Sequence, residues 1–297
     1  MFDLFVGIDW SGAKGTAHKG ISVFCAQQGS AVPQKMHAPH GKAAFSRHDV
    51  ADLLITLSSQ ARVLAGIDFA FAYPLDAAGH YFPGLAPEKQ PQTAPQLWAL
   101  IDRLNDAAPD YYGGLIWDDA TYGPYYNAPA GRKGARFASR RRQTEEAAKS
   151  VKSPSPTFNC VGPAGVGTGS LAGMRLCHSL HHQLGDRLAI WPFTASDKAA
   201  LTMVEIFPSY YFKQAGISPI KGAQAGADNL NYALAFFNSE PVADDFTAHG
   251  PDHDDADALI SAAALRAIES EPKCWDVPDC AKREGWIFGV NSAKTPS

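Results

Sequence analysis

Three acidic segments of the sequence carry side chains that could bind a metal ion. An apolar run closes with Gly-Ile-Asp at Asp9, and the same tripeptide closes a second apolar run at Asp68. The third segment, residues 253–260, reads His-Asp-Asp-Ala-Asp-Ala-Leu-Ile and contributes Asp254 and Asp257. Carboxylate oxygens are hard ligands, which suit Mg²⁺ or Mn²⁺ better than zinc. The residue types therefore predict a site for one of these two ions.

The spacing of these acids is compatible with a single site. Asp254 and Asp257 are three residues apart, so they would share one face of a helix. Asp9 and Asp68 end apolar strands, and sites in open α/β sheets form at the carboxyl ends of strands. Each aspartate alone could be a turn or cap residue, but capping does not account for Asp257 inside the first helical turn. Like charges at this spacing repel, and a divalent cation would compensate for that repulsion.

Glu205 is a fifth candidate for the same site. It lies inside an apolar run, residues 204–208, which reads Val-Glu-Ile-Phe-Pro. A carboxylate in such a strand either faces outward at the edge of a sheet or belongs to a site. The sequence leaves both interpretations open for this residue.

Basic and aromatic residues gather between positions 111 and 142. The basic members are Arg132, Lys133, Arg136, Arg140, Arg141 and Arg142. The aromatic members are Tyr111, Tyr112, Trp117, Tyr122, Tyr125 and Tyr126. Arginines can hold phosphates and aromatic rings can stack on bases, so we expect the five arginines to contact a nucleic-acid substrate. The alternative is a solvated basic loop beside a small aromatic core.

The hydrophobic pattern predicts an α/β fold. Apolar and β-branched runs predict strands over residues 4–8, 20–26, 35–39, 62–68, 201–207 and 285–290. Helical spacing predicts helices over residues 46–60, 94–107, 228–238 and 256–268, and a further helix from residue 170. The glycine-rich stretch 162–173 precedes that helix, and it is either a close-packed turn or a phosphate contact.

The pattern also divides the chain into three parts. Residues 1–74 and 201–297 form the two halves of a core, and residues 75–200 are an insertion rich in proline, glycine and aromatic residues. We expect the insertion to carry the substrate contacts and residues 291–297 to form a loose tail.

The bulk composition narrows the class of protein. With 45% hydrophobic and 19% charged residues among 297, the chain should fold as a globular protein. Its net charge of −4 gives no global sign of nucleic-acid binding, so any basic surface must be local. The five cysteines form no CxxC pair, which favours reduced thiols in the cytoplasm. No signal peptide and no membrane span are expected.

These segments resemble the DUF429 family, predicted nucleases of the ribonuclease H-like superfamily. The resemblance covers residues 1–74 and 201–290 and rests on the strands ending at Asp9 and Asp68, the Val-Glu-x-x-Pro run at 204–208, and the acidic start of the last long helix. It implies a ribonuclease H-like mixed sheet flanked by helices. Asp9 would lie at the end of the first strand and Asp68 at the end of the fourth.

The resemblance implies metal-dependent hydrolysis of phosphodiester bonds in DNA or RNA. Two Mg²⁺ or Mn²⁺ ions would be held by the carboxylates. Under this hypothesis Asp9 bridges both ions and Asp68 and Asp257 each bind one. Asp254 or Glu205 completes the shell.

Two other functions are compatible with the same motifs. The segment 7–12, Gly-Ile-Asp-Trp-Ser-Gly, resembles the first phosphate motif of actin-like ATPases and sugar kinases, so an ATP-dependent phosphotransferase is one alternative. No second glycine-rich phosphate loop follows Asp68, which counts against it. The other alternative is a non-catalytic binding protein that keeps the fold.

Overall fold

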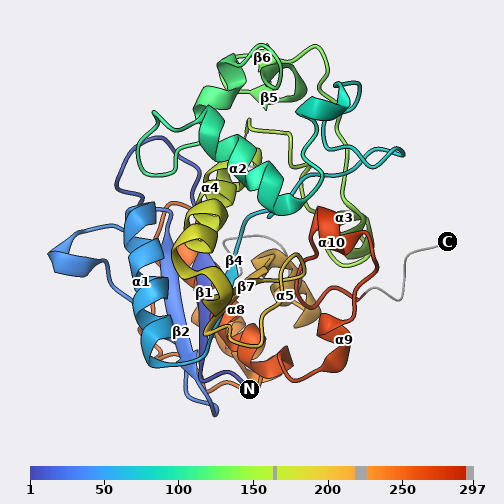
Figure 1. The fold of residues 1–297 in the computed structure, drawn as a ribbon. Helices are drawn as coiled ribbons and strands as arrows, with labels where there is room; N and C mark the ends of the chain where they lie inside the picture. Colours follow the sequence, from blue (N-terminus) through green and yellow to red (C-terminus); the bar gives the residue numbers. More distant parts are fainter. Residues whose placement is uncertain (163–165, 218–225, 292–297) are drawn as a thin grey trace.

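The computed structural model describes residues 1–162, 166–217 and 226–291, and at its centre is a six-stranded mixed sheet (Figure 1). The strands are β1 (Leu4–Asp9), β2 (Ser22–Gln27), β3 (Gln34–Lys35), β4 (Val63–Ile67), β7 (Leu188–Ile190) and β8 (Leu201–Glu205). Their order across the sheet is β3-β2-β1-β4-β8-β7. The pairs β3-β2 and β2-β1 are antiparallel, whereas β1-β4, β4-β8 and β8-β7 are parallel. The chain therefore has an α/β fold with a mixed sheet.

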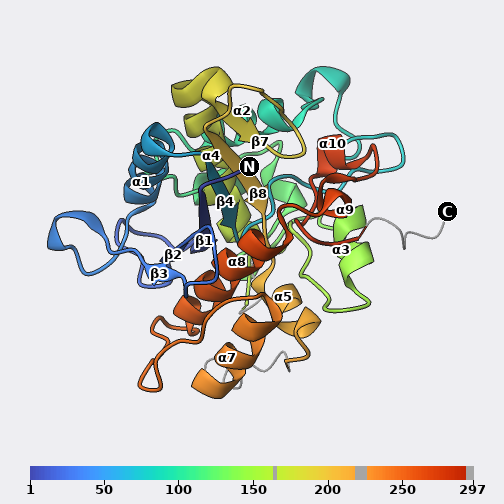
Figure 2. The same cartoon turned by 90° about the horizontal axis from the view of Figure 1, so that it is seen from below.

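Helices cover both faces of this sheet. They are α1 (Arg47–Gln60), α2 (Ala94–Leu104), α3 (Gln143–Ala148), α4 (Val166–Leu184), α5 (Pro208–Gln214), α7 (Ala227–Phe236), α8 (Asp254–Ile268), α9 (Pro272–Trp275) and α10 (Ala281–Glu284). Figure 2 shows α1 and α4 on one side of the strands, and α8, α5 and α7 on the other. The start of α1 is fixed by a capping box, in which Ser46 and Asp49 each accept a hydrogen bond from the other's backbone amide.

Alternating side chains along each central strand divide the core into two layers. On β1, Val6 and Ile8 pack with α1 and α4, while Phe5 packs with α8. On β8, Met203 joins the first layer and Val204 the second. Successive residues of a strand point to opposite faces, so a strand buried on both faces is apolar throughout. This is why the core strands read as continuous apolar runs in the sequence.

Helix α8 lies directly against the centre of the sheet because β1 carries a glycine at the contact. A Cβ atom at Gly7 would lie 2.2 Å from the carbonyl oxygen of Ala258 and 2.5 Å from the amide nitrogen of Ala262. Small residues on the facing side of the helix complete this close approach, and α8 is buried along almost its whole length. The contact sets the position of the acidic first turn of α8 relative to the end of β1.

The predicted insertion is part of the same hydrophobic core. Residues such as Tyr126 and Leu171 lie in one apolar cluster with Ile8 and Ile67 of the sheet. Strand β7 also lies between residues 75 and 200, and it forms an edge of the main sheet. Beyond one end of the sheet, the insertion adds a small hairpin of β5 (Asn127–Ala128) and β6 (Arg132–Lys133) (Figure 1).

The predicted elements overlap the observed ones except near the C-terminus, although the third strand covers only Gln34–Lys35 instead of residues 35–39. The initial order of three strands, a helix and a strand is confirmed. The predicted strand at 285–290 is wrong: only a single bridge joins Ile287 to Glu205, although Trp286, Phe288 and Val290 are buried. The segment is apolar because it is buried. A buried segment that does not pair with another strand has the same apolar pattern in the sequence as a strand. The expected tail lies almost wholly outside the described residues, as do residues 163–165 of the glycine-rich stretch.

None of the helices within the described ranges has both the length and the apolarity needed to cross a bilayer.

Candidate active site

Four of the predicted site residues line a single pocket of about 640 Å³. These are Asp9, Asp68, Asp254 and Asp257, and we call this hollow the acid pocket. Asp252 adds a fifth carboxylate to the lining. The acids come from the end of β1, the residue after β4, and the start of α8. Three segments that are distant in sequence therefore bring their carboxylates to one place.

The alternation of the strands explains why the two strand-end aspartates meet α8. On β1, Phe5 and Asp9 are four residues apart, so their side chains point to the same face of the sheet. Phe5 packs in the layer that contains α8. On β4, Leu64 packs in that layer, and Asp68 follows it by an even number of residues. The two strands are parallel neighbours, so their carboxyl ends lie side by side. Both aspartates thus face the N-terminus of α8.

The charged form of Asp9 is electrostatically unfavourable in the acid pocket. Burial raises the pKa of Asp9 well above its ordinary value, and the charges of Asp257, Asp68 and Asp254 raise it further. Asp254 also lies within hydrogen-bonding reach of Asp9. Asp9, Asp254 and Asp257 are each less than a tenth exposed, so water screens their repulsion poorly. A proton on Asp9 or a bound cation would relieve it.

The donor set fits a hard divalent cation. Its side-chain donors are carboxylate oxygens, which Mg²⁺ and Mn²⁺ prefer. Among the described residues, no group of three or more His, Cys, Asp or Glu side chains is arranged to hold a metal ion. The carboxylates of the acid pocket would therefore have to move closer together to bind a cation.

One wall of the acid pocket comes from residues 152–155 of the insertion, and it brings a positive charge. Lys152, Ser153 and Ser155 line the same pocket as the aspartates. The Nε of Arg141 donates a hydrogen bond to the carbonyl oxygen of Pro154 at 3.3 Å, which holds this wall in place. Lys152 was not identified from the sequence, because a single lysine in a polar stretch carries no signal of its own.

Glu205 lies away from the acid pocket. Its parity places it with Met203, on the opposite face of the sheet from α8. There it pairs with both terminal nitrogens of Arg142, one of them at 2.7 Å, and accepts the backbone amide of Phe71 at 3.1 Å. Glu145 accepts a further bond from Arg142 at 2.8 Å. We therefore leave Glu205 out of the metal site.

Arg142 has a structural role in the same buried group. Its side chain is 2% exposed, and burial lowers its pKa less than Glu205 and Glu145 raise it, so the guanidinium stays charged. It also donates to the carbonyl oxygen of Glu284 at 3.1 Å. Its hydrogen bonds join the insertion to β8 and α10. Arg142 is therefore no longer proposed as a substrate contact.

The other predicted substrate contacts are largely held by the protein itself. Arg140 donates to the carbonyl oxygens of Pro74 and Tyr81, at 3.1 and 2.8 Å. Arg136 lies over the ring of Tyr125 and donates to its hydroxyl at 2.8 Å. Arg132 pairs with Asp118 over the ring of Trp117. Tyr111, Tyr122, Tyr125 and Tyr126 are all buried. These contacts favour the aromatic-core alternative for most of this segment, with Arg132 and Arg136 still exposed.

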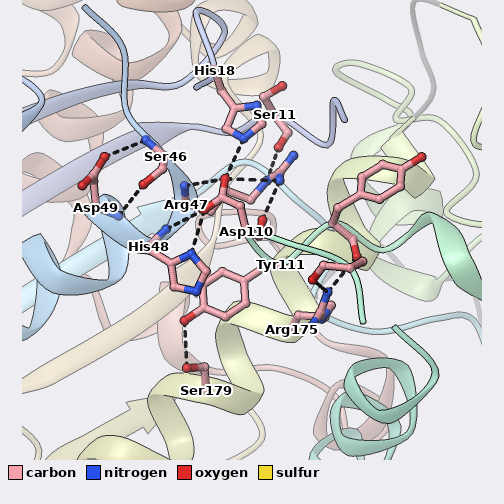
Figure 3. A network of polar contacts seen from close by, with 12 residues as sticks. Ser11, His18, Ser46, Arg47, His48, Asp49, Asp110, Tyr111, Arg175 and Ser179 are labelled. Carbon is pink, nitrogen blue, oxygen red and sulfur yellow. Dashed lines mark hydrogen bonds and ion pairs between the residues drawn. The ribbon is translucent and has the colours of Figure 1, made fainter. Parts of the chain in front are cut away.

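A buried carboxylate, Asp110, joins the insertion to the first half of the core (Figure 3). One of its oxygens lies 2.8 Å from Nε2 of His18 and accepts the amide of Arg47, while the other lies 2.9 Å from Nδ1 of His48 and accepts that residue's amide. Burial acts to raise the pKa of Asp110, but these hydrogen bonds outweigh it and hold the pKa below its ordinary value. His18 and Asp110 are 92 positions apart, so sequence spacing gave no sign of this group.

Arg47 connects this anchor to the turn that follows Asp9. Its guanidinium is fully buried and donates to the carbonyl oxygens of Ser11, Ala13 and Asp110, at 2.8, 2.6 and 2.7 Å (Figure 3). Ala13 also lines the acid pocket. The chain just beyond Asp9 is therefore held by a charged side chain from α1.

Comparison with known proteins finds no matching family model, no matching curated protein and no matching solved structure. The function of this chain must therefore be argued from its own residues. The acid pocket gathers several carboxylates, among them Asp9 with its raised pKa, and grouped carboxylates of this kind are candidates for a functional site.

Proposed function

We propose that this protein is a metal-dependent nuclease that hydrolyses phosphodiester bonds in DNA or RNA. The observation that carries the proposal is the convergence of Asp9, Asp68, Asp254 and Asp257 on one pocket. Burial and the charges of Asp257, Asp68 and Asp254 raise the pKa of Asp9. A perturbed carboxylate grouped with others in a pocket is a candidate for a functional site.

The fold supports the same proposal, and we propose that it is ribonuclease H-like. Three antiparallel strands are followed by parallel strands on the other side of β1. Asp9 ends β1, Asp68 follows the fourth strand, and Asp254 and Asp257 lie in the first turn of α8. These are the positions that the resemblance to the DUF429 family implied for its acids.

The chain's own residues would hold the cations and orient the substrate. When bound, Mg²⁺ or Mn²⁺ stabilises negative charge on phosphate oxygens and lowers the pKa of a bound water. The four aspartates of the acid pocket would hold the cations, with Asp9 lying among the other three. The ammonium group of Lys152, which lines the same pocket, would attract a phosphate. The pocket walls would fix the scissile bond between these two sets of charges.

Calorimetry with Mn²⁺ and Mg²⁺ tests the proposal most directly. The natural protein should bind Mn²⁺, and an Asp9→Asn/Asp257→Asn variant should not. A variant that removes two exposed acids elsewhere, Asp106→Asn/Asp279→Asn, should bind like the natural protein. Cleavage of labelled DNA and RNA should follow the same pattern. Undiminished cleavage by the Asp9→Asn/Asp257→Asn variant would refute the role of the acid pocket, and a natural protein that neither binds Mn²⁺ nor cleaves would leave only the fold.

A further inference from the structure

A second pocket, of about 460 Å³, lies beside the acid pocket at the β2-β3 edge of the sheet. We call it the edge pocket. The polar side chains in its lining that matter here are Lys19, Lys35, His37, Lys42, His249 and Asp255. Three lysines and one carboxylate give this lining a net positive charge, in a chain whose overall charge is −4. A local excess of positive charge attracts an anionic ligand.

The carboxylate of Asp255 holds the ammonium group of Lys35 in position. Asp255 is 3% exposed, and it accepts hydrogen bonds from Ser22 Oγ at 2.6 Å and from the amide of His249 at 3.1 Å. The Nζ of Lys35 donates a hydrogen bond to Oδ2 of Asp255 at 2.6 Å, and the Lys35 side chain is still about a third exposed. Lys35 is therefore held at the pocket mouth with donors left for a ligand.

The other two lysines are more available. Lys42 pairs with Asp49 at 2.8 Å, but its side chain is about half exposed. Lys19 is exposed and has no ion pair among the residues that the structure describes. Both come from loops that border the same pocket. Together with Lys35 they place ammonium groups from three separate segments around one opening.

The interior of the edge pocket is apolar. Ile21, Val23, Met36 and Phe45 contribute to its lining. Phe45 and Ile21 are well buried, so they form a fixed surface. A ligand that fits has a flat or apolar body and an anionic group at the mouth. A nucleotide has this chemistry, with its base and sugar as the body and its phosphate as the anion.

A thin wall separates the edge pocket from the acid pocket. Gly250, Pro251 and Asp255 line the edge pocket, whereas Asp252 and Asp254 line the acid pocket. Gly250 has a left-handed backbone, with φ of +102°, and a Cβ atom there would lie 2.1 Å from Oδ2 of Asp254. Only glycine allows this close approach of the wall to the site. The short segment 250–255 therefore contributes residues to both pockets.

We propose that the edge pocket binds a nucleotide of a single nucleic-acid strand, next to the phosphodiester that lies over the acid pocket. Lys19, Lys35 and Lys42 contact the phosphate, and the apolar interior contacts the sugar and base. This inference rests on the proposed function, because the neighbouring acid pocket identifies the ligand as a polynucleotide. Under this proposal the main substrate contacts lie at the β2-β3 edge of the sheet, and not in the arginine-rich insertion.

The test is binding of short fluorescein-labelled single-stranded DNA and RNA, followed by fluorescence anisotropy in EDTA so that no cleavage occurs. The Lys19→Gln/Lys42→Gln variant should bind about tenfold more weakly. The slope of log K against log salt should become shallower by about 1.4, since each lost phosphate contact contributes about 0.7 on a single strand. The control variant Lys89→Gln/Lys282→Gln loses the same charge from other parts of the surface and should bind normally.

A second measurement on the unaltered protein guards against a variant that fails to fold. The bound oligonucleotide should protect Lys19 and Lys42, but not Lys282, from acetylation, as read by mass spectrometry. No binding by the natural protein, equal weakening in both double variants, or no protection would each overturn the proposal. A mononucleotide that competes as well as the strand would overturn the assignment to a polynucleotide.

The same experiment separates this inference from the nuclease proposal. The Asp9→Asn/Asp257→Asn variant should bind the oligonucleotide in EDTA at least as tightly as the natural protein, because the edge pocket needs no metal and two fewer carboxylates repel the phosphate. If metal binding and cleavage both fail while the loss specific to Lys19 and Lys42 persists, the nuclease proposal falls and the edge pocket stands as a nucleic-acid site. If cleavage succeeds and the lysine variant binds normally, only the edge pocket falls.

Discussion

At the scale of single residues, the defining feature of this protein is a buried carboxylate whose charge is opposed by its neighbours. Asp9 is 8% exposed, and burial together with the nearby aspartates raises its pKa. A group whose folded pKa is raised contributes stability at low pH, and that contribution is lost as the pH rises through the folded value. The metal-free protein therefore carries an energetic cost at Asp9 that a cation would remove.

We expect the Asp9→Asn variant to be more stable than the natural protein in EDTA. Asparagine keeps the shape of the side chain but removes the charge, so the gain should be on the order of 1–3 kcal/mol, as for other buried groups relieved of an unmet charge. Thermal melting at neutral and alkaline pH measures it, and the gain should be larger at alkaline pH. The exposed Asp106→Asn change should have no effect. A less stable Asp9→Asn protein would show that Asp9 has a stabilising partner in the absence of metal.

At the scale of elements, the site depends on how closely α8 approaches β1. The first turn of α8 supplies Asp254 and Asp257, and the end of β1 supplies Asp9. Gly7 sets the distance between the two elements, because backbone atoms of α8 occupy the space that a side chain at this position would need. The repeated Gly-Ile-Asp tripeptide thus combines a packing position with a site position two residues later.

We expect Gly7→Ala to destabilise the protein and to weaken Mn²⁺ binding together. The added Cβ would meet backbone atoms of Ala258 and Ala262, which cannot move without shifting α8, at a cost of about 1–3 kcal/mol. Urea unfolding and calorimetry measure the two effects. Gly169→Ala is the control for the urea measurement, because its Cβ would lie 3.8 Å from the nearest atom. Loss of stability with unchanged Mn²⁺ affinity would mean that α8 does not set the spacing of the acids.

At the scale of the whole molecule, charged groups in the interior join the insertion to the sheet. Asp110 connects the insertion to β2's preceding loop and to α1, through His18, Arg47 and His48 (Figure 3). Arg142 makes a second connection, to β8. Buried ion pairs of this kind add little net stability over apolar residues, but they penalise any arrangement that separates the partners. The insertion and the core should therefore unfold as one unit.

We expect Asp110→Asn to cost about 3–5 kcal/mol at neutral pH, because it leaves the buried Arg47 without its counter-charge. Asn tolerates the left-handed backbone at this position, with φ of 49°, so the loss should be electrostatic. The lowered pKa of Asp110 means that its contribution is present above the ordinary aspartate pKa of about 3.9 and is lost as the pH falls. Urea unfolding at neutral and acidic pH should show a difference from the natural protein that shrinks in acid. An equal difference at both would point to lost packing instead.

The sequence alone determined the class of fold and the acids of the candidate site. Continuous apolar runs indicate strands buried on both faces. Apolar residues at helical spacing indicate α1, α2 and α8, because these side chains pack into the core. Asp9 and Asp68 were identified because they end apolar strands, and Asp254 and Asp257 because they begin a helix.

Only the tertiary structure decided which charges meet. Glu205 is in a strand like the aspartates' strands, but its side chain faces the other layer, and the sequence does not say which face α8 covers. The arginines of the insertion look like a binding surface until the fold supplies their partners, and Lys19 and Lys42 become neighbours only when separate loops border one pocket. Strand and helix patterns are local, whereas ion pairs and pockets depend on contacts between residues tens to hundreds of positions apart. That is the physical reason why the sequence indicated the acids but not the groups that surround them.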